Sequence, residues 1–75
     1  MEAVLFGLSR DAKTETAIAM LHDSRKVFSF TDVKSTGSSL MEAVTAMTNS
    51  YELPVLAHEG VIYVGIESIR RYCGN

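Results

Sequence analysis

Cysteine, tryptophan and proline are scarce or absent in this chain of 75 residues, which has one cysteine, no tryptophan and one proline. A single cysteine, Cys73, cannot form a disulfide within the chain, cannot supply a Cys-x-x-Cys motif, and fits a reducing compartment. The two histidines, His22 and His58, have no spacing of acidic or thiol partners that would make a zinc site. We therefore expect no metal, and we interpret both histidines as surface residues and Cys73 as a half-buried, unreactive thiol.

Long apolar runs and clustered positive charge are also missing. The longest apolar runs span about five residues, far short of the ~20 that a membrane helix needs, and residues 1–4 do not resemble a signal peptide. Seven basic residues stand against nine acidic ones, a net charge of −2, so the counterion release that drives nucleic-acid binding would be small. We expect a cytoplasmic protein that binds neither membranes nor nucleic acid.

The composition that is present is that of one folded domain. Hydrophobic residues make up 47% of the chain and charged residues 21%, values typical of a soluble globular protein rather than a disordered one. A chain of this size buries only about 60% of its unfolded surface, which leaves no apolar surplus for a second core. Residues 1–75 are predicted to form a single domain.

The first half of the chain has the pattern of a strand, a helix and a second strand. Residues 3–6 are a continuous apolar run, typical of a strand buried on both faces. Helical spacing follows on an inner face formed by Thr14, Ala17, Ile18 and Leu21. Ser9 or Asp11 can cap this helix, and the alternation over residues 27–31 predicts the next strand. The helix between the strands predicts a parallel pair with a right-handed crossover.

The second half begins with a polar loop over residues 32–39. A second helix is predicted after it, with an apolar face formed by Leu40, Val44, Met47 and Tyr51. Pro54 then opens a hairpin in which residues 55–58 and 61–64 are strands. Glu59 and Gly60 make its two-residue turn, where Gly60 can adopt positive φ. Apolar residues at helical spacing after Gly65 predict a terminal helix.

The order of these elements resembles the glutaredoxin branch of the thioredoxin fold over nearly the whole chain. The residues that carry the resemblance are Leu-Pro-Val-Leu at 53–56, where proline opens a strand, and Val-Gly-Ile-Glu-Ser at 64–68, where glycine ends one. The resemblance implies that Pro54 follows a cis peptide bond. We expect an α/β fold of order βαβαββα with a four-stranded mixed sheet, strand order 2-1-3-4. One helix should cover one face, and two the other face or its ends.

The resemblance places Asp11-Ala12-Lys13-Thr14 where glutaredoxins have Cys-x-x-Cys. That chemistry needs a thiolate at the start of the helix, where the helix dipole lowers the thiol pKa. Asp11 keeps the negative charge, which stabilises the helix by ~0.3–1 kcal/mol, but neither Asp11 nor Thr14 can exchange disulfides. The fold is therefore expected to persist without catalytic redox activity.

The ligand groove of glutaredoxins should be altered as well. Glutaredoxins often have a lysine three residues before the first thiol, where it meets a glutathione carboxylate, and Leu8 occupies that position. Glu52 adds a negative charge beside Pro54, so glutathione would meet like charge. No cofactor is expected, and glutathione binding should be weak or absent. The candidate ligand-binding residues are Arg10, Asp11, Lys13, Leu53, Pro54, Glu67 and Ser68.

These observations favour a non-catalytic glutaredoxin-like binding or interaction protein for an extended peptide or a protein partner beside Pro54. One alternative is a glutathione- or thiol-linked protein of cell redox homeostasis and electron transfer that acts through Cys73 or a partner thiol. Another is a small homo-oligomerising domain that extends its sheet at residues 27–31 or 61–64. A monomer or a weak homodimer is expected. These residues also have a purely structural interpretation. Pro54 would then only shape a turn, and Asp11 and residues 67–68 would only cap helices.

Overall fold

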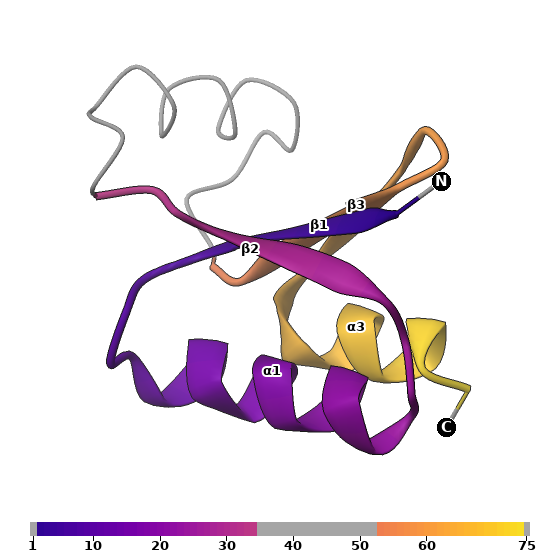
Figure 1. Cartoon of the computed structure of the whole chain (residues 1–75), viewed down its shortest axis with the longest axis horizontal. Coiled ribbons are helices and arrows are strands. Elements are labelled where there is room, and N and C mark those ends of the chain that lie inside the picture. The colour runs from indigo at the N-terminus through magenta and orange to yellow at the C-terminus, as the bar shows by residue number, and fades with distance from the viewer. Residues whose placement is uncertain (1, 35–52, 75) are drawn as a thin grey trace.

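The computed structural model describes residues 2–34 and 53–74, in which two helices accompany four strands (Figure 1). In chain order the elements are β1 (Ala3–Gly7), α1 (Ala12–Asp23), β2 (Phe28–Asp32), β3 (Val55–His58), β4 (Val61–Val64) and α3 (Gly65–Tyr72). The helix predicted around residues 40–51, most of the loop before it, and Glu52 lie outside the described residues.

The four strands form one mixed sheet in the order β2-β1-β3-β4, which confirms the predicted order. β1 and β2 are parallel, whereas β3 runs antiparallel to both β1 and β4. Phe6 lies opposite Thr31 on one side and Val55 on the other, and Val55 lies opposite Val64. The end of β1, the start of β3 and the end of β4 therefore meet at one end of the sheet.

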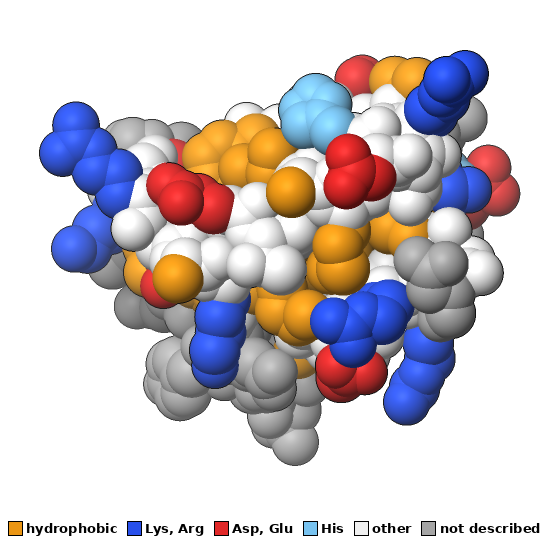
Figure 2. Space-filling view, turned by 90° about the horizontal axis from the view of Figure 1, so that it is seen from below, with side chains coloured by type: hydrophobic (Ala, Val, Ile, Leu, Met, Phe, Trp, Pro, Cys, Tyr) orange, Lys and Arg blue, Asp and Glu red, His pale blue; other side chains and the backbone are white. Residues whose placement is uncertain are grey.

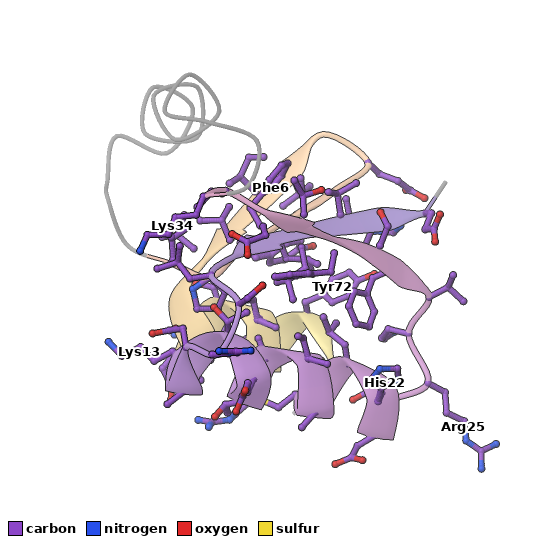
Figure 3. The ribbon with its side chains drawn as sticks, turned by 60° about the vertical axis from the view of Figure 1, so that its left-hand side comes forward. Phe6, Lys13, His22, Arg25, Lys34 and Tyr72 are labelled. Carbon is purple, nitrogen blue, oxygen red and sulfur yellow. The ribbon has the colours of Figure 1, made fainter. Side chains whose placement is uncertain are left out.

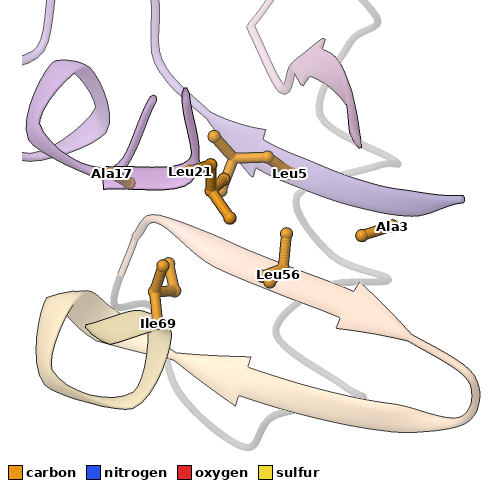
Figure 4. Packing of buried hydrophobic residues seen from close by; sticks show 6 residues of the cluster. All are labelled: Ala3, Leu5, Ala17, Leu21, Leu56 and Ile69. Carbon is orange, nitrogen blue, oxygen red and sulfur yellow. The ribbon is translucent and has the colours of Figure 1, made fainter. Parts of the chain in front are cut away.

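α1 and α3 lie on the same face of this sheet (Figure 1). The core between them and the strands consists of fully buried side chains (Figure 4), namely Ala3, Leu5, Ala17, Leu21, Leu56 and Ile69. Leu5 and Leu56 lie opposite each other on β1 and β3, so their side chains share the face that the helices cover. The predicted inner face of α1 is confirmed at Thr14, Ala17 and Leu21, all buried.

The outer surface of the helices is polar. Lys13, Glu15 and Asp23 are exposed on α1, as the helical spacing predicts. Seen from the helical side, basic and acidic side chains are interspersed between smaller hydrophobic areas (Figure 2). This face of the molecule therefore has no dominant charge of one sign.

Two details of the predicted strands were wrong. Val4 and Phe6 are only partly buried, because they alternate with Ala3 and Leu5 and point away from the face that α1 and α3 cover. The second strand begins at Phe28, which lies opposite Ala3, and Val27 before it is 73% exposed. A continuous apolar run thus indicated the strand correctly but not the burial of both its faces.

The β3–β4 hairpin has the predicted two-residue turn. His58 and Val61 are the last paired residues, and the two residues between them both have positive φ, 50° at Glu59 and 81° at Gly60. Two successive positive φ values are those of a type I′ turn, whose twist matches that of the flanking strands. A Cβ at Gly60 would meet nothing within 4 Å. Glycine is therefore favoured here because of the positive φ, and not because a larger side chain would clash.

Candidate functional site

The candidate site lies at the end of the sheet where α1 and α3 begin. α1 follows β1, α3 follows β4, and Pro54 immediately precedes β3. The Leu53–Pro54 peptide bond is cis, and the Pro54 side chain is fully buried. The carbonyl oxygen of Pro54 accepts a hydrogen bond of 2.9 Å from the backbone N–H of Gly65. That bond joins the start of β3 to the start of α3.

Asp11 and Thr14 form a hydrogen-bonded cap at the start of α1. Asp11 is the N-cap residue, and its Oδ2 accepts from the Thr14 backbone N–H at 3.0 Å and from Thr14 Oγ1 at 3.2 Å. The same Thr14 oxygen accepts from the backbone N–H of Leu8 at 3.2 Å. Thr14 is only 1% exposed. Its hydroxyl therefore both donates and accepts within the protein.

Thr14 also packs tightly against the last residue of β1. A Cβ built on Gly7 would lie 2.6 Å from Thr14 Cγ2 and 2.7 Å from Thr14 Oγ1, closer than real side chains approach. Only glycine at position 7 leaves room for Thr14 at this place. The segment 11–14 therefore packs closely against β1, with the Thr14 side chain directed inward.

A second set of hydrogen bonds ties the loop between β1 and α1 to the end of β2. Asp32 Oδ2 accepts from the Ser9 backbone N–H at 3.3 Å and also from the Ser9 hydroxyl. Asp32 Oδ1 accepts from the Lys34 N–H at 2.9 Å, and the Val33 N–H donates to the Gly7 carbonyl at 3.0 Å. Ser9, one of the two predicted caps, thus contacts β2 instead. Asp32 was not among the predicted site residues, although an acidic residue at the end of a strand parallel to β1 was the available signal.

Arg10 and Lys13 are the basic candidates, and both are exposed beside this network. Arg10 has a left-handed conformation with φ of 66°, unusual for a residue with a Cβ. The loop it belongs to closes with a hydrogen bond of 3.2 Å from the Asp11 N–H to the Leu8 carbonyl. The tight loop holds Arg10 outward, so both cations adjoin the start of α1 while Asp11 is engaged within it.

Glu67 and Ser68 lie in the first turn of α3, but the predicted cap there was wrong. The N-cap residue is Val64, and it makes no side-chain cap hydrogen bond. Glu67 instead contacts Arg70 Nη1 at 2.5 Å in an ion pair one turn along the helix, with the Glu67 side chain 73% exposed. The helix dipole still favours the Glu67 carboxylate in the first turn, although the side chain makes no capping hydrogen bond to the backbone.

Cys73 lies away from this site, at the C-cap of α3, where it is half-buried. The eight residues of α3 separate it from Gly65 by roughly 12 Å of helix. The thiol therefore lies a helix length away from the end of the sheet at which α3 begins. The half-buried position matches the prediction from the sequence.

An aromatic group surrounds Tyr72 at the far end of α3. The ring of Tyr72 is 5.0 Å from that of Tyr63 and 5.4 Å from that of His58, and Lys26 Nζ is 5.3 Å from its centroid. Burial raises the pKa of Tyr72, and Tyr63, Cys73 and Glu59 raise it further. His58 is half-buried, with 25% of its side chain exposed, so the predicted surface histidine lies only partly at the surface.

The other histidine is placed as predicted. His22 is exposed near the end of α1, and its ring meets the Phe28 ring edge-on at 5.5 Å. Among residues 2–34 and 53–74, no group of three histidine, cysteine or acidic side chains could hold a metal ion. In the same part of the chain, no helix is long and apolar enough to cross a membrane.

Comparisons with known proteins bear on the fold. No protein-family model matches the chain, and no curated protein matches it in sequence. A glutaredoxin from Archaeoglobus fulgidus has a similar solved structure, with a TM-score of 0.83 and 18% identity over 99% of this chain and 87% of that one. A diazinon-metabolizing glutathione S-transferase of the silkworm Bombyx mori aligns with a TM-score of 0.81 and 22% identity, over 96% of this chain and 36% of the transferase. The chain therefore has the thioredoxin-like fold found in glutaredoxins.

Proposed function

We propose that this protein is a non-catalytic binding module of the thioredoxin fold, which takes an extended peptide or a protein segment beside Pro54. The observation that carries the proposal is the cap formed by Asp11, Thr14 and the Leu8 N–H. By the resemblance to glutaredoxins, positions 11 and 14 are those of the two thiols. Here both side chains are used to hold the start of α1.

The chemistry of these two groups supports loss of exchange. Thiol–disulfide exchange requires a thiolate that attacks a disulfide sulfur and forms a mixed disulfide. A carboxylate and a hydroxyl cannot form that bond, and the Thr14 hydroxyl belongs to a residue that is only 1% exposed. Cys73 is the only thiol of the sequence, and it lies at the other end of α3.

The binding half of the proposal rests on the surroundings of Pro54. In glutaredoxins, the residue before the cis proline offers its backbone to an extended ligand, and Leu53 holds that position here, half-buried. Arg10 and Lys13 are exposed at the start of α1 and supply positive charge for a carboxylate. Leu8 in place of a lysine removes one further contact, so glutathione is expected to bind weakly.

A thiol-transfer assay tests the catalytic half. Glutathione and a mixed-disulfide substrate are supplied to the native protein and to Cys73→Ser, and both should give only the uncatalysed rate. Turnover that survives in Cys73→Ser would contradict the proposal. Turnover in the native protein that Cys73→Ser abolishes would instead support the alternative of a redox protein acting through Cys73.

An amide chemical-shift titration tests the binding half. Glutathione, and separately an extended acidic peptide, should perturb residues 8–11, 53–55 and 65–68 if the groove is retained. Lys13→Gln should weaken the binding, whereas Arg71→Gln, an equal change of charge at another exposed helical position, should not. No perturbation with either ligand would leave a structural domain without a groove function.

A further inference from the structure

β2 is an outer strand of the sheet. It pairs with β1 on one side only, and no other strand within residues 2–34 and 53–74 pairs with it. An edge strand directs half of its backbone N–H and C=O groups outward, where another extended chain can bind them. β4 is the outer strand on the opposite side, so the molecule offers two edges that differ in their side chains.

The β2 strand itself lacks two of the features that usually prevent pairing with another chain. Phe28–Asp32 contains neither proline nor lysine, the residues that commonly protect edges. The acidic residue that ends it, Asp32, already accepts hydrogen bonds from Ser9. Large hydrophobic side chains are exposed here, with Val27 73% and Phe30 37% accessible. Val27 lies just before the strand and Phe30 at its centre, so this edge can bury apolar side chains of a partner.

Positive charge flanks the β2 edge. Residues 25–34 carry three exposed basic residues, Arg25, Lys26 and Lys34, against Asp32, a net charge of +2 in a chain whose total is −2. In Figure 3, Lys34 lies just past the end of β2, and Arg25 lies before its start, on the loop that joins α1 to β2. The β4 edge differs, since residues 59–66 contain one glutamate, Glu59, and no basic residue.

We propose that the outer edge of β2 binds an extended segment of a partner protein that is apolar in its centre and acidic at both ends. The segment adds a fifth strand to the sheet through backbone hydrogen bonds. Its central side chains cover Val27 and Phe30, and its acidic ends approach Arg25 and Lys34. This surface is separate from the groove beside Pro54, so the proposal goes beyond the function proposed above.

The dimensions of the strand set the length of the partner segment. Lys34 follows Arg25 by nine positions in the sequence, which corresponds to at most ~30 Å in extended chain. A nine-residue peptide with alternating valine and threonine in its centre and two acidic residues at each end matches this span. The same peptide with lysine in place of the acidic residues is the matched control probe.

Amide chemical-shift titration of the whole protein with both peptides tests the proposal. The acidic peptide should perturb residues 27–33, bind more tightly than the lysine peptide, and weaken as salt is raised. Lys34→Glu should weaken its binding by about two- to fivefold, the range of one exposed ion pair. Arg71→Glu makes the same change of charge on α3 and should leave the binding unchanged.

Several results would overturn the proposal. Perturbation at residues 61–64 or 53–55 in place of 27–33, or equal binding of the two peptides, would remove the β2 site. Shifts at residues 27–33 that depend on protein concentration without peptide would show a second copy of the chain as the occupant. The thiol-transfer assay concerns the start of α1, so its outcome is independent of this one.

Discussion

Replacing Thr14 with valine tests whether the candidate active site has become a structural cap. The valine keeps the shape that packs on Gly7 but removes the hydroxyl. The Leu8 N–H, 3.2 Å from Thr14 Oγ1, then loses its acceptor, and Asp11 loses one of its two donors. An unsatisfied buried donor costs about 1–3 kcal/mol. Because the hydrogen bond to Leu8 is only partly buried, we expect the free energy of unfolding to fall by about 1–2 kcal/mol.

Urea unfolding of the native protein, Thr14→Val and Thr16→Val measures this difference. Thr16 is the matched control, since it lies on the same helix, is exposed, and donates its hydroxyl to the Ala12 carbonyl at 2.9 Å. Thr16→Val should change the free energy of unfolding by no more than about 0.5 kcal/mol. With an m value of about 1 kcal/mol/M, Thr14→Val should lower the midpoint by about 1–2 M.

Equal free energies of unfolding for the two variants, within about 0.5 kcal/mol, would contradict a structural role for the Thr14 hydroxyl, because that is the normal range of surface substitutions. The Thr14 hydroxyl would then be energetically neutral, and the network could not be the reason that threonine stands there. An m value that is the same in all three proteins would show that the surface exposed on unfolding is unchanged, so that the shift in midpoint reports a change in stability.

Three further predictions concern other parts of the fold. The pKa of Tyr72 is raised above its ordinary 10.0 by burial first and by Tyr63 next, so the folded state holds this proton more tightly. The free energy of unfolding should be unaffected below about pH 10 and fall as the pH rises from there through the folded pKa, and Tyr72→Phe should reduce that fall in urea midpoints. Gly7→Ala should destabilise the protein by about 1–3 kcal/mol in urea unfolding, because its Cβ overpacks Thr14; an unchanged midpoint would contradict the close packing. Leu56→Ala should lower the free energy of unfolding by about 2–5 kcal/mol in the same measurement, and Val61→Ala, at an exposed position, by at most about 0.5 kcal/mol. Equal losses in the two variants would contradict the burial of Leu56 in the core.

Most of the fold could be predicted because local patterns decide it. The spacing of Thr14, Ala17 and Leu21 indicated the inner face of α1, and the helix between the first two strands favoured a parallel pair with a right-handed crossover. The hairpin followed from Gly60, since a two-residue turn of this kind needs positive φ. These features depend on residues close together in the sequence.

The errors in the strands arise from contacts that the sequence pattern does not contain. Val4 and Phe6 are apolar like Ala3 and Leu5, and only the placement of both described helices on one face separates the two pairs. Val27 has the β-branched side chain of a strand residue, yet strand pairing begins where Phe28 meets Ala3. Residue type alone does not show which residue pairs with a neighbouring strand.

At the candidate site, a cap at the start of α1 could be predicted from the sequence, but the hydrogen-bond partners of Ser9 and Glu67 could not. Asp11 and Ser9 were equally suited to cap α1, and the choice was decided by Asp32, which lies 23 residues from Ser9. Glu67 had the residue type and position of a helix-capping group, but Arg70 one turn away engages its carboxylate. Long-range hydrogen bonds and side-chain competition therefore account for what the sequence missed.

The loss of the thiol at the start of α1 can be tested by restoring a cysteine there in a background without Cys73. Thiol transfer with glutathione is measured for Cys73→Ser and for Cys73→Ser combined with Asp11→Cys. A cysteine at the start of α1 should have a lowered thiol pKa. Activity is expected to appear only in the double variant, which carries its single thiol at the start of α1. Exchange by Cys73→Ser alone would contradict the account, because the chain would then catalyse the reaction with no thiol of its own.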